Sequence, residues 1–174
     1  MLSGDLVYLR ALEPSDATQM MIWENAMSNW RVSGTEVPYS LFAIKEYIEK
    51  NQSIRSSGQL RLIVCDKESE KSIGTLDLFE VNFKHGFASV GILIADESDR
   101  SKGYALDSLF ILEKYAREVL GLRNLMASMH EDNTASFKLF EKAGFEKIGI
   151  KKYWLSVGNK WVDELMMQLC LKEK

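Results

Sequence analysis

Residues 100–105 combine a glycine and two cations in the sequence Arg-Ser-Lys-Gly-Tyr-Ala, between an apolar run and a helical pattern. The apolar run at 90–95 predicts a strand, and the periodicity from Tyr104 to about Leu120 predicts a helix. A helix N-terminus presents unpaired N–H groups and the positive end of the helix dipole, which favour a phosphate or pyrophosphate. Gly103 would let the backbone approach such a ligand, and Arg100 and Lys102 would add positive charge beside it. Taken alone, these residues also fit an ordinary helix that begins with a glycine and a cation.

The composition is that of an ordinary globular domain, and it excludes several classes of function. The 174 residues are 46% apolar and 27% charged, which predicts one domain, residues 1–174, with a full hydrophobic core. A net charge of −3 provides no general attraction for nucleic acid or an anionic membrane, whereas a cationic acceptor would meet a mildly favourable field. No Cys/His spacing indicates a metal site. Neither a leader pattern nor a long apolar run occurs, so we expect a cytoplasmic protein.

Periodicity and turn residues predict seven strands and four helices along the chain. We expect strands at 6–10, 59–66, 73–81, 87–95, 122–130, 145–155 and 161–171. We expect helices from Glu13 to about Met27, from 38–40 to about Gln52, at 104–120, and from 133–134 to 143–144. The order β-α-α-β-β-β-α-β-α-β-β places antiparallel meanders around one βαβ crossover. The predicted fold is therefore α/β (α+β), a mixed, mostly antiparallel sheet of about seven strands with helices on both faces.

A second motif follows the strand predicted at 122–130. Residues 133–145 read Asn-Thr-Ala-Ser-Phe-Lys-Leu-Phe-Glu-Lys-Ala-Gly-Phe. Together with Arg100-x-x-Gly103-x-Ala105, this segment resembles the GCN5-related N-acetyltransferase (GNAT) superfamily, whose signatures are Gln/Arg-x-x-Gly-x-Gly/Ala and Asn-x-Ala-Ser…Glu-Lys-x-Gly-Phe. Residues 9–17 (Leu-Arg-x-Leu-Glu-x-x-Asp-Ala) and 159–163 (Asn-x-x-x-Asp) are similar to the branch with the ribosomal-protein N-terminal-amine acetyltransferases and the spermidine acetyltransferases. The resemblance covers essentially the whole chain and implies a GNAT-like fold.

The resemblance also implies acetyl-CoA as the co-substrate. The loop at 100–105 would bind the pyrophosphate, and the pantetheine arm would run between the strands at 90–95 and 124–130, hydrogen-bonded to the main chain there. Asn133 and Ser136 would face that arm; alternatively, Asn133 is a helix N-cap and Ser136 an incidental polar residue. The implied CoA-binding residues are Ile92, Leu93, Ile94, Arg100, Ser101, Lys102, Gly103, Tyr104, Ala105, Asn133 and Ser136.

Two positions depart from the catalytic pattern that the resemblance implies. Many relatives have a glutamate base on the strand before the loop, where this chain has Ser89 or Val90. They often have a tyrosine acid on the helix after Asn133, where this chain has Phe140, which cannot donate a proton. Catalysis would then rest on positioning, with ordered water or other acids handling protons.

Three other side chains are acid–base candidates: Asp77, Glu80 and His85. They lie on the strand–turn–strand before the loop, in a segment that resembles the bacterial spermidine acetyltransferases. Asp77 and Glu80 would point to opposite sides of a regular strand unless a bulge intervenes. Glu80 and His85 can alternatively be solvated hairpin residues.

These observations favour an acetyl-CoA-dependent N-acetyltransferase that transfers the acetyl group directly to a primary amine. The acceptor would be a polyamine-like small molecule or a protein N-terminus, and carboxylates on the acceptor side suit a polycation. The alternative is an acyl-CoA-binding module with little or no catalysis, favoured by Phe140 and by the missing glutamate near Ser89. A purely structural protein would leave the two spaced motifs unexplained. Edge strands and the aromatic C-terminal half are compatible with a homo-oligomer.

Overall fold

Side chains alternate along strand β3, Leu60–Asp66, in a way that requires a sheet covered on both faces. Leu62 and Val64 belong to one hydrophobic cluster, and Ile63 and Cys65, which point the opposite way, belong to a second. All four side chains are buried. This is why the strand reads in the sequence as a continuous apolar run rather than as an alternation of apolar and polar residues.

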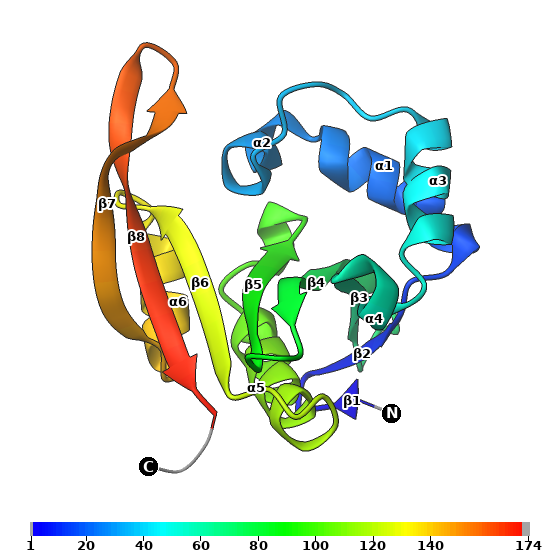
Figure 1. Ribbon diagram of the computed structural model, residues 1–174. Coiled ribbons are helices and arrows are strands. Elements are labelled where there is room, and N and C mark those ends of the chain that lie inside the picture. The colour runs from blue at the N-terminus through cyan, green and yellow to red at the C-terminus, as the bar shows by residue number, and fades with distance from the viewer. Residues whose placement is uncertain (1, 172–174) are drawn as a thin grey trace.

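The computed structural model describes residues 2–171, in which eight strands form one sheet (Figure 1). The sheet order is β1-β2-β3-β4-β5-β6-β8-β7, and β5–β6 is the one parallel pair among the described strands. This confirms the predicted mixed, mostly antiparallel sheet, to which the short β1 adds one strand beside β2. The remaining strand bounds are β1 Leu2–Ser3, β2 Val7–Ala11, β4 Ser72–Asn82, β5 Phe87–Ile94, β6 Asn124–His130, β7 Glu146–Val157 and β8 Lys160–Cys170.

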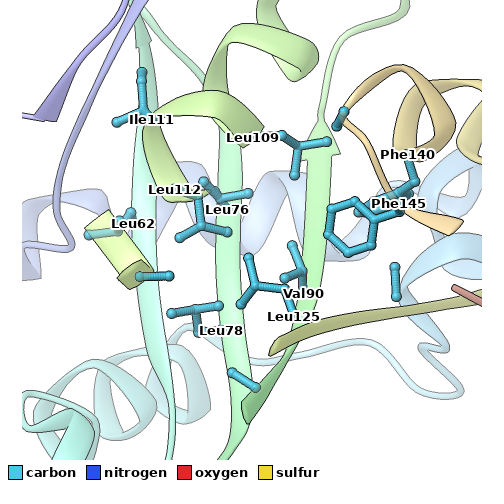
Figure 2. Packing of buried hydrophobic residues seen from close by; sticks show 14 of the residues in the cluster. Leu62, Leu76, Leu78, Val90, Leu109, Ile111, Leu112, Leu125, Phe140 and Phe145 are labelled. Carbon is cyan, nitrogen blue, oxygen red and sulfur yellow. The ribbon is translucent and has the colours of Figure 1, made fainter. Parts of the chain in front are cut away.

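Helices cover both faces of this sheet, as predicted. Helices α5 and α6 contribute Leu109, Leu112 and Phe140 to the larger cluster, which packs against β3, β4, β5 and β6 (Figure 2). Helices α1 and α3 cover the opposite face around Ile63. The helix bounds are α1 Ala17–Asn25, α2 Met27–Ser33, α3 Leu41–Lys50, α4 Ile54–Ser57, α5 Tyr104–Glu118 and α6 Thr134–Lys142. Within residues 2–171, none of these helices has the length and apolarity that a membrane span needs.

The helix expected from Glu13 to about Met27 is instead a 3-10 turn at Pro14–Asp16 followed by two helices. Ala26 is extended, with φ −70° and ψ 110°, which ends α1 and lets α2 begin at the next residue. The buried amide of Asn29 donates a hydrogen bond of 3.2 Å to the carbonyl of Trp23 and fixes the angle between α1 and α2. Neither glycine nor proline marks this break in the sequence, so the prediction was wrong there. The short α4 likewise lies in a stretch, 53–58, that was expected only to separate two elements.

Asp16 joins strand β2 to the start of α1, and we expect its replacement by asparagine to lower stability. Its two carboxylate oxygens accept hydrogen bonds from the Arg10 guanidinium, both at 2.7 Å, and one also accepts from the Glu13 N–H at 2.9 Å. Hydrogen bonds from Arg10 are the main reason that the pKa of Asp16 lies below its usual value. Asp16→Asn should reduce the free energy of unfolding at neutral pH by about 1–2 kcal/mol, as measured by urea denaturation.

The difference in unfolding free energy between the wild-type protein and Asp16→Asn should shrink as the pH is lowered. A carboxyl whose pKa is lower when folded contributes stability above its unfolded pKa, about 3.9, and loses it as the pH falls through the folded value. Glu46→Gln removes an exposed pair with Lys50 on α3 and serves as the control, with an expected change of at most about 0.5 kcal/mol. A difference between wild type and Asp16→Asn that persists unchanged into strong acid would contradict this assignment.

Candidate functional site

Strands β5 and β6 run side by side for a short distance and then separate. Their parallel pairing ends at Ser89↔Met126, whereas β5 continues to Ile94 and β6 continues to His130. The other edge of β5 stays paired with β4 as far as Ile94. From Val90 onward, the edge of β5 that faces β6 therefore has no strand partner within the described chain. Its N–H and C=O groups can bond to an extended ligand.

A cavity of about 620 Å³ lies at this separation. Residues 90–93 of β5 and 128–130 of β6 form part of its wall, and α6 contributes Asn133, Ser136 and Phe140. Residues of α1, α2, α3, β3 and β4 line most of the rest, together with Leu155 of β7, Glu164 of β8 and a few residues of the connecting loops. Among the predicted CoA-binding residues, Ile92, Leu93, Asn133 and Ser136 line this cavity, while Ile94 and the loop at 100–105 lie outside its lining.

The loop at 100–105 leads into α5 and leaves the N-terminus of that helix open. Gly103, with φ +91°, occupies the N-cap position, and no side chain caps the helix. Ser101 also has a positive φ, 62°. Ser101, Lys102 and Gly103 are exposed, while Tyr104 and Ala105 are partly exposed. The N–H groups of the first turn can therefore meet an anion, which the helix dipole favours.

Arg100 and Lys102, the two cations of this loop, are both engaged with other groups of the protein. Arg100 donates from Nε to the Ile94 carbonyl at 3.1 Å and from Nη2 to Oδ1 of Asn29 at 2.9 Å. It thereby ties α2 to the end of β5. Lys102 donates to Oδ1 of Asp99 at 2.8 Å, and this hydrogen bond raises the pKa of Lys102. The sequence indicates the positive charge of this loop but not the contact between Arg100 and Asn29, which lie 71 residues apart in the chain.

Asn133 has the N-cap role that the sequence left open, and it also lines the cavity. Its Oδ1 accepts a hydrogen bond of 3.1 Å from the Ser136 N–H at the start of α6. Phe140, one turn further along, is buried edge-on to Phe145, with ring centroids 5.0 Å apart (Figure 2). Its ring borders the cavity and supplies an apolar wall with no proton to donate. Ser89 is the last residue of β5 that pairs with β6.

The three acid–base candidates have different positions. Asp77 lines the cavity, whereas Glu80 and His85 are exposed and lie outside its lining. A bulge in β4 between Phe79 and Asn82, with Glu80 at φ +52°, turns the end of the strand. The Glu80 carboxylate accepts a hydrogen bond from the Ser89 hydroxyl at 2.9 Å. The bulge that the sequence allowed is therefore present, and it leaves only Asp77 of these three facing the cavity.

Asp77 belongs to a partly buried charge cluster with Glu24 and Arg61. Arg61 donates to both oxygens of Asp77, at 2.6 and 3.0 Å, and to Oε1 of Glu24 at 2.7 Å. Burial alone would lower the pKa of Arg61, but the charge and hydrogen bonds of Asp77 more than offset it, and the pKa is raised. Its guanidinium lies 5.2 Å from the ring centroid of Tyr47, whose own pKa is raised mainly by burial. Two carboxylates around one guanidinium leave this wall with one net negative charge.

Neither Glu24 nor Arg61 was predicted from the sequence, and only Arg61 has a signal in the sequence that could have identified it. Arg61 is the one charged residue inside the apolar run 60–65, and Glu24 ends an otherwise uncharged stretch of helix. A charged residue in an apolar strand needs a buried partner, and this rule points to Asp77 directly across from Arg61 in the β3–β4 register. No such rule identifies Glu24, which lies in a different element.

Comparisons with known proteins give consistent matches to one family and fold. The family model described as an acetyltransferase (GNAT) domain matches residues 7–146. The spermidine N(1)-acetyltransferase of Vibrio cholerae is 30% identical over 144 residues, which cover 81% of this chain and 79% of that protein. A crystal structure of spermidine N-acetyltransferase from Vibrio cholerae, in complex with CoA and spermine, matches with a TM-score of 0.86 at 24% identity, covering 95% of this chain and 96% of the other. A dodecameric structure of spermidine N-acetyltransferase from Vibrio cholerae has a TM-score of 0.79 at 25% identity, with coverage of 95% and 94%.

Proposed function

Because the chain belongs to the GNAT acetyltransferase family, whose members are acyltransferases, we propose that it transfers the acetyl group of acetyl-CoA to a primary amine of a polyamine-like acceptor. The observation that carries the choice of acceptor is the charge of the cavity wall. The carboxylates of Glu24, Asp77 and Glu164 outnumber the guanidinium groups of Arg31 and Arg61 there. An acceptor with several ammonium groups is stabilised by such an excess of negative charge.

The unpaired edge of β5 and the open N-terminus of α5 support a binding site for the donor. The pyrophosphate lies at the N-terminus of α5, where Gly103 allows close approach and the first-turn N–H groups point outward. The pantetheine arm follows the unpaired edge of β5 past Ile92 and Leu93. Asn133 and Ser136 border the arm from the side of α6, and the thioester reaches the cavity beside the apolar ring of Phe140.

Direct transfer then needs an unprotonated amine, a stabilised oxyanion and a leaving thiolate. A backbone N–H on the unpaired edge of β5 can donate to the oxyanion as the tetrahedral intermediate forms. A thiol with a pKa of about 8.5 leaves tolerably as a thiolate, so a buried phenylalanine at position 140 does not prevent the step. Alkyl amines titrate near pH 10, so the acceptor must lose a proton before attack.

Glu24 is the side chain that we expect to distinguish a polycation from a simple amine. Oε1 of Glu24 accepts a hydrogen bond from Arg61, whereas Oε2 of Glu24 has no hydrogen bond within the part of the chain that the structure describes. The side chain is 13% exposed and lines the cavity, so an ammonium group there would form a contact shielded from water. Such a contact would bind a second ammonium of the acceptor, away from the reacting nitrogen.

The test is release of free CoA thiol with acetyl-CoA and a panel of spermidine, a simple monoamine and amino-terminal peptides. We expect turnover with the highest kcat/KM for spermidine. Glu24→Gln should raise the KM for spermidine about tenfold, the equivalent of one charge-assisted contact, and change that for the monoamine by less than about twofold. Glu46→Gln, on the exposed surface of α3, should change neither.

Two other outcomes would overturn the proposal in different ways. Preferred turnover of peptides would assign the acceptor as a protein N-terminus. Stabilisation by CoA against heat without thiol release from any amine would assign an acyl-CoA-binding module. The expected homo-oligomer stays a prediction, although one structural relative is dodecameric.

A further inference from the structure

The chain has two histidines, and their surroundings differ. His85 lies exposed in the turn between β4 and β5, outside the cavity. His130 ends β6, beyond the point where β5 and β6 separate, and lines the cavity. Its Nδ1 is buried and has no hydrogen-bond partner in residues 2–171. Buried polar atoms almost always have a partner, so this nitrogen is open to a bound substrate or water molecule.

The charged groups around His130 are already paired with one another. Glu164, its cross-strand neighbour on β8, accepts a hydrogen bond of 2.7 Å from Lys151 of β7. Asp132, which follows β6, accepts two hydrogen bonds from Arg31 of α2, at 2.6 and 2.8 Å. The exposed Glu131 lies between His130 and Asp132 in the chain. Neither Glu164 nor Asp132 holds the imidazole by a hydrogen bond, so the ring is free to exchange a proton with a bound molecule.

The carboxylates that line the cavity are each paired with a cation: Asp77 and Glu24 with Arg61, and Glu164 with Lys151. Asp77 is bonded through both oxygens to Arg61. Positions 89 and 90 carry no carboxylate, and Glu80 lies outside the cavity. Imidazole, in contrast, both accepts and releases protons near neutral pH. His130, at the end of β6, lines the same cavity as the charge cluster and the unpaired edge of β5.

We propose that His130 is a catalytic residue that takes the proton from the acceptor ammonium before the amine attacks the thioester. The inference rests on the proposed acetyl transfer. As the C–N bond forms, the carbonyl π electrons move to oxygen; as they return, the C–S bond breaks and sulfur keeps its electron pair. The nitrogen loses its second proton in this step, and water carries that proton to the thiolate. His130 releases the first proton to solvent, so ammonium and thioester give amide, thiol and one free proton.

The experiment compares His130→Gln with His85→Gln in the full chain, with acetyl-CoA and spermidine as substrates. We expect His130→Gln to lower kcat at neutral pH by at least about 100-fold, while the Kd for CoA changes by less than about twofold. In His130→Gln only solvent can deprotonate the amine. The residual rate of this variant should therefore continue to rise with pH in the range where the wild-type rate has become constant. His85→Gln should keep the wild-type rate and pH profile.

A second measurement does not depend on the variant being active. The His130 imidazole resonances of the wild-type protein should shift when CoA and spermidine bind together, and those of His85 should not. Wild-type kcat and an unchanged pH profile in His130→Gln would overturn the assignment while leaving the proposed function intact. Absence of thiol release by the wild-type protein would overturn both. Unshifted His130 resonances in an active wild-type protein would overturn the catalytic role alone.

Discussion

Gly103→Glu is expected to abolish CoA binding, raising the Kd by more than about 100-fold in isothermal titration calorimetry. Gly103 is the N-cap of α5, at φ +91°, and a side chain there would lie beside the uncapped N–H groups of the first turn. A glutamate would place a carboxylate where the N–H groups and the helix dipole favour the pyrophosphate, so it would compete for the donors and repel the ligand. It would also remove the close approach that only glycine permits.

The control for this substitution lies at the other end of the same helix. Gly121 has φ +67° and no atom within 4 Å of the position that a Cβ would take, so Gly121→Glu imposes similar backbone strain without touching the loop. Both variants should lose about 1–2 kcal/mol of unfolding free energy, but only Gly103→Glu should lose CoA. The Cβ of a residue at 103 would lie 3.0 Å from Cδ1 of Leu6, a side-chain end that can move. Unchanged CoA affinity in Gly103→Glu would show that the pyrophosphate binds elsewhere.

The sequence predicts most of the sheet because strand period and turn residues are local signals. The strands at 59–66 and 87–95 are found within one residue of their predicted ends. A short apolar run bounded by polar turn residues is compatible with few secondary structures other than a buried strand. The break at Ala26 could not be predicted in the same way. Its extended conformation is stabilised by the buried amide of Asn29, a contact that becomes visible only once α1 and α2 are packed.

The candidate site likewise has parts that local sequence signals predict and parts that depend on long-range contacts. The loop at 100–105 and the start of α6 are contiguous motifs, and the sequence places both beside the correct strands. The charge cluster is not contiguous, because Glu24, Arg61 and Asp77 come from α1, β3 and β4. His130 was missed for a further reason. A histidine that ends a strand looks ordinary until the separation of β5 and β6 shows that it lines a cavity. Contiguous motifs can thus be located from sequence, whereas the rest of the cavity depends on contacts between distant elements.

Arg61→Leu should be the most destabilising single change in this site, with an expected loss of about 3–5 kcal/mol in unfolding free energy by urea denaturation. Arg61 is 19% exposed, and its partners Asp77 and Glu24 are 20% and 13% exposed. Leucine fills much of the same space but leaves two partly buried carboxylates side by side with no cation. The penalty is therefore that of unpaired charge rather than of a lost contact.

This origin of the penalty can be tested by neutralising the carboxylates. Adding Asp77→Asn and Glu24→Gln to Arg61→Leu should restore most of the lost stability, because no unpaired charge then remains. Lowering the pH should narrow the gap between Arg61→Leu and wild type, since protonation also removes the two charges. Arg31→Leu is the matched control: Arg31 and Asp132 are 51% and 60% exposed, so breaking that pair should cost at most about 1 kcal/mol. If instead the triple variant were as unstable as Arg61→Leu, the cluster would stabilise the fold through packing, and its excess negative charge would cost the folded protein little. That outcome would leave the carboxylates available to an acceptor ammonium even without their arginine.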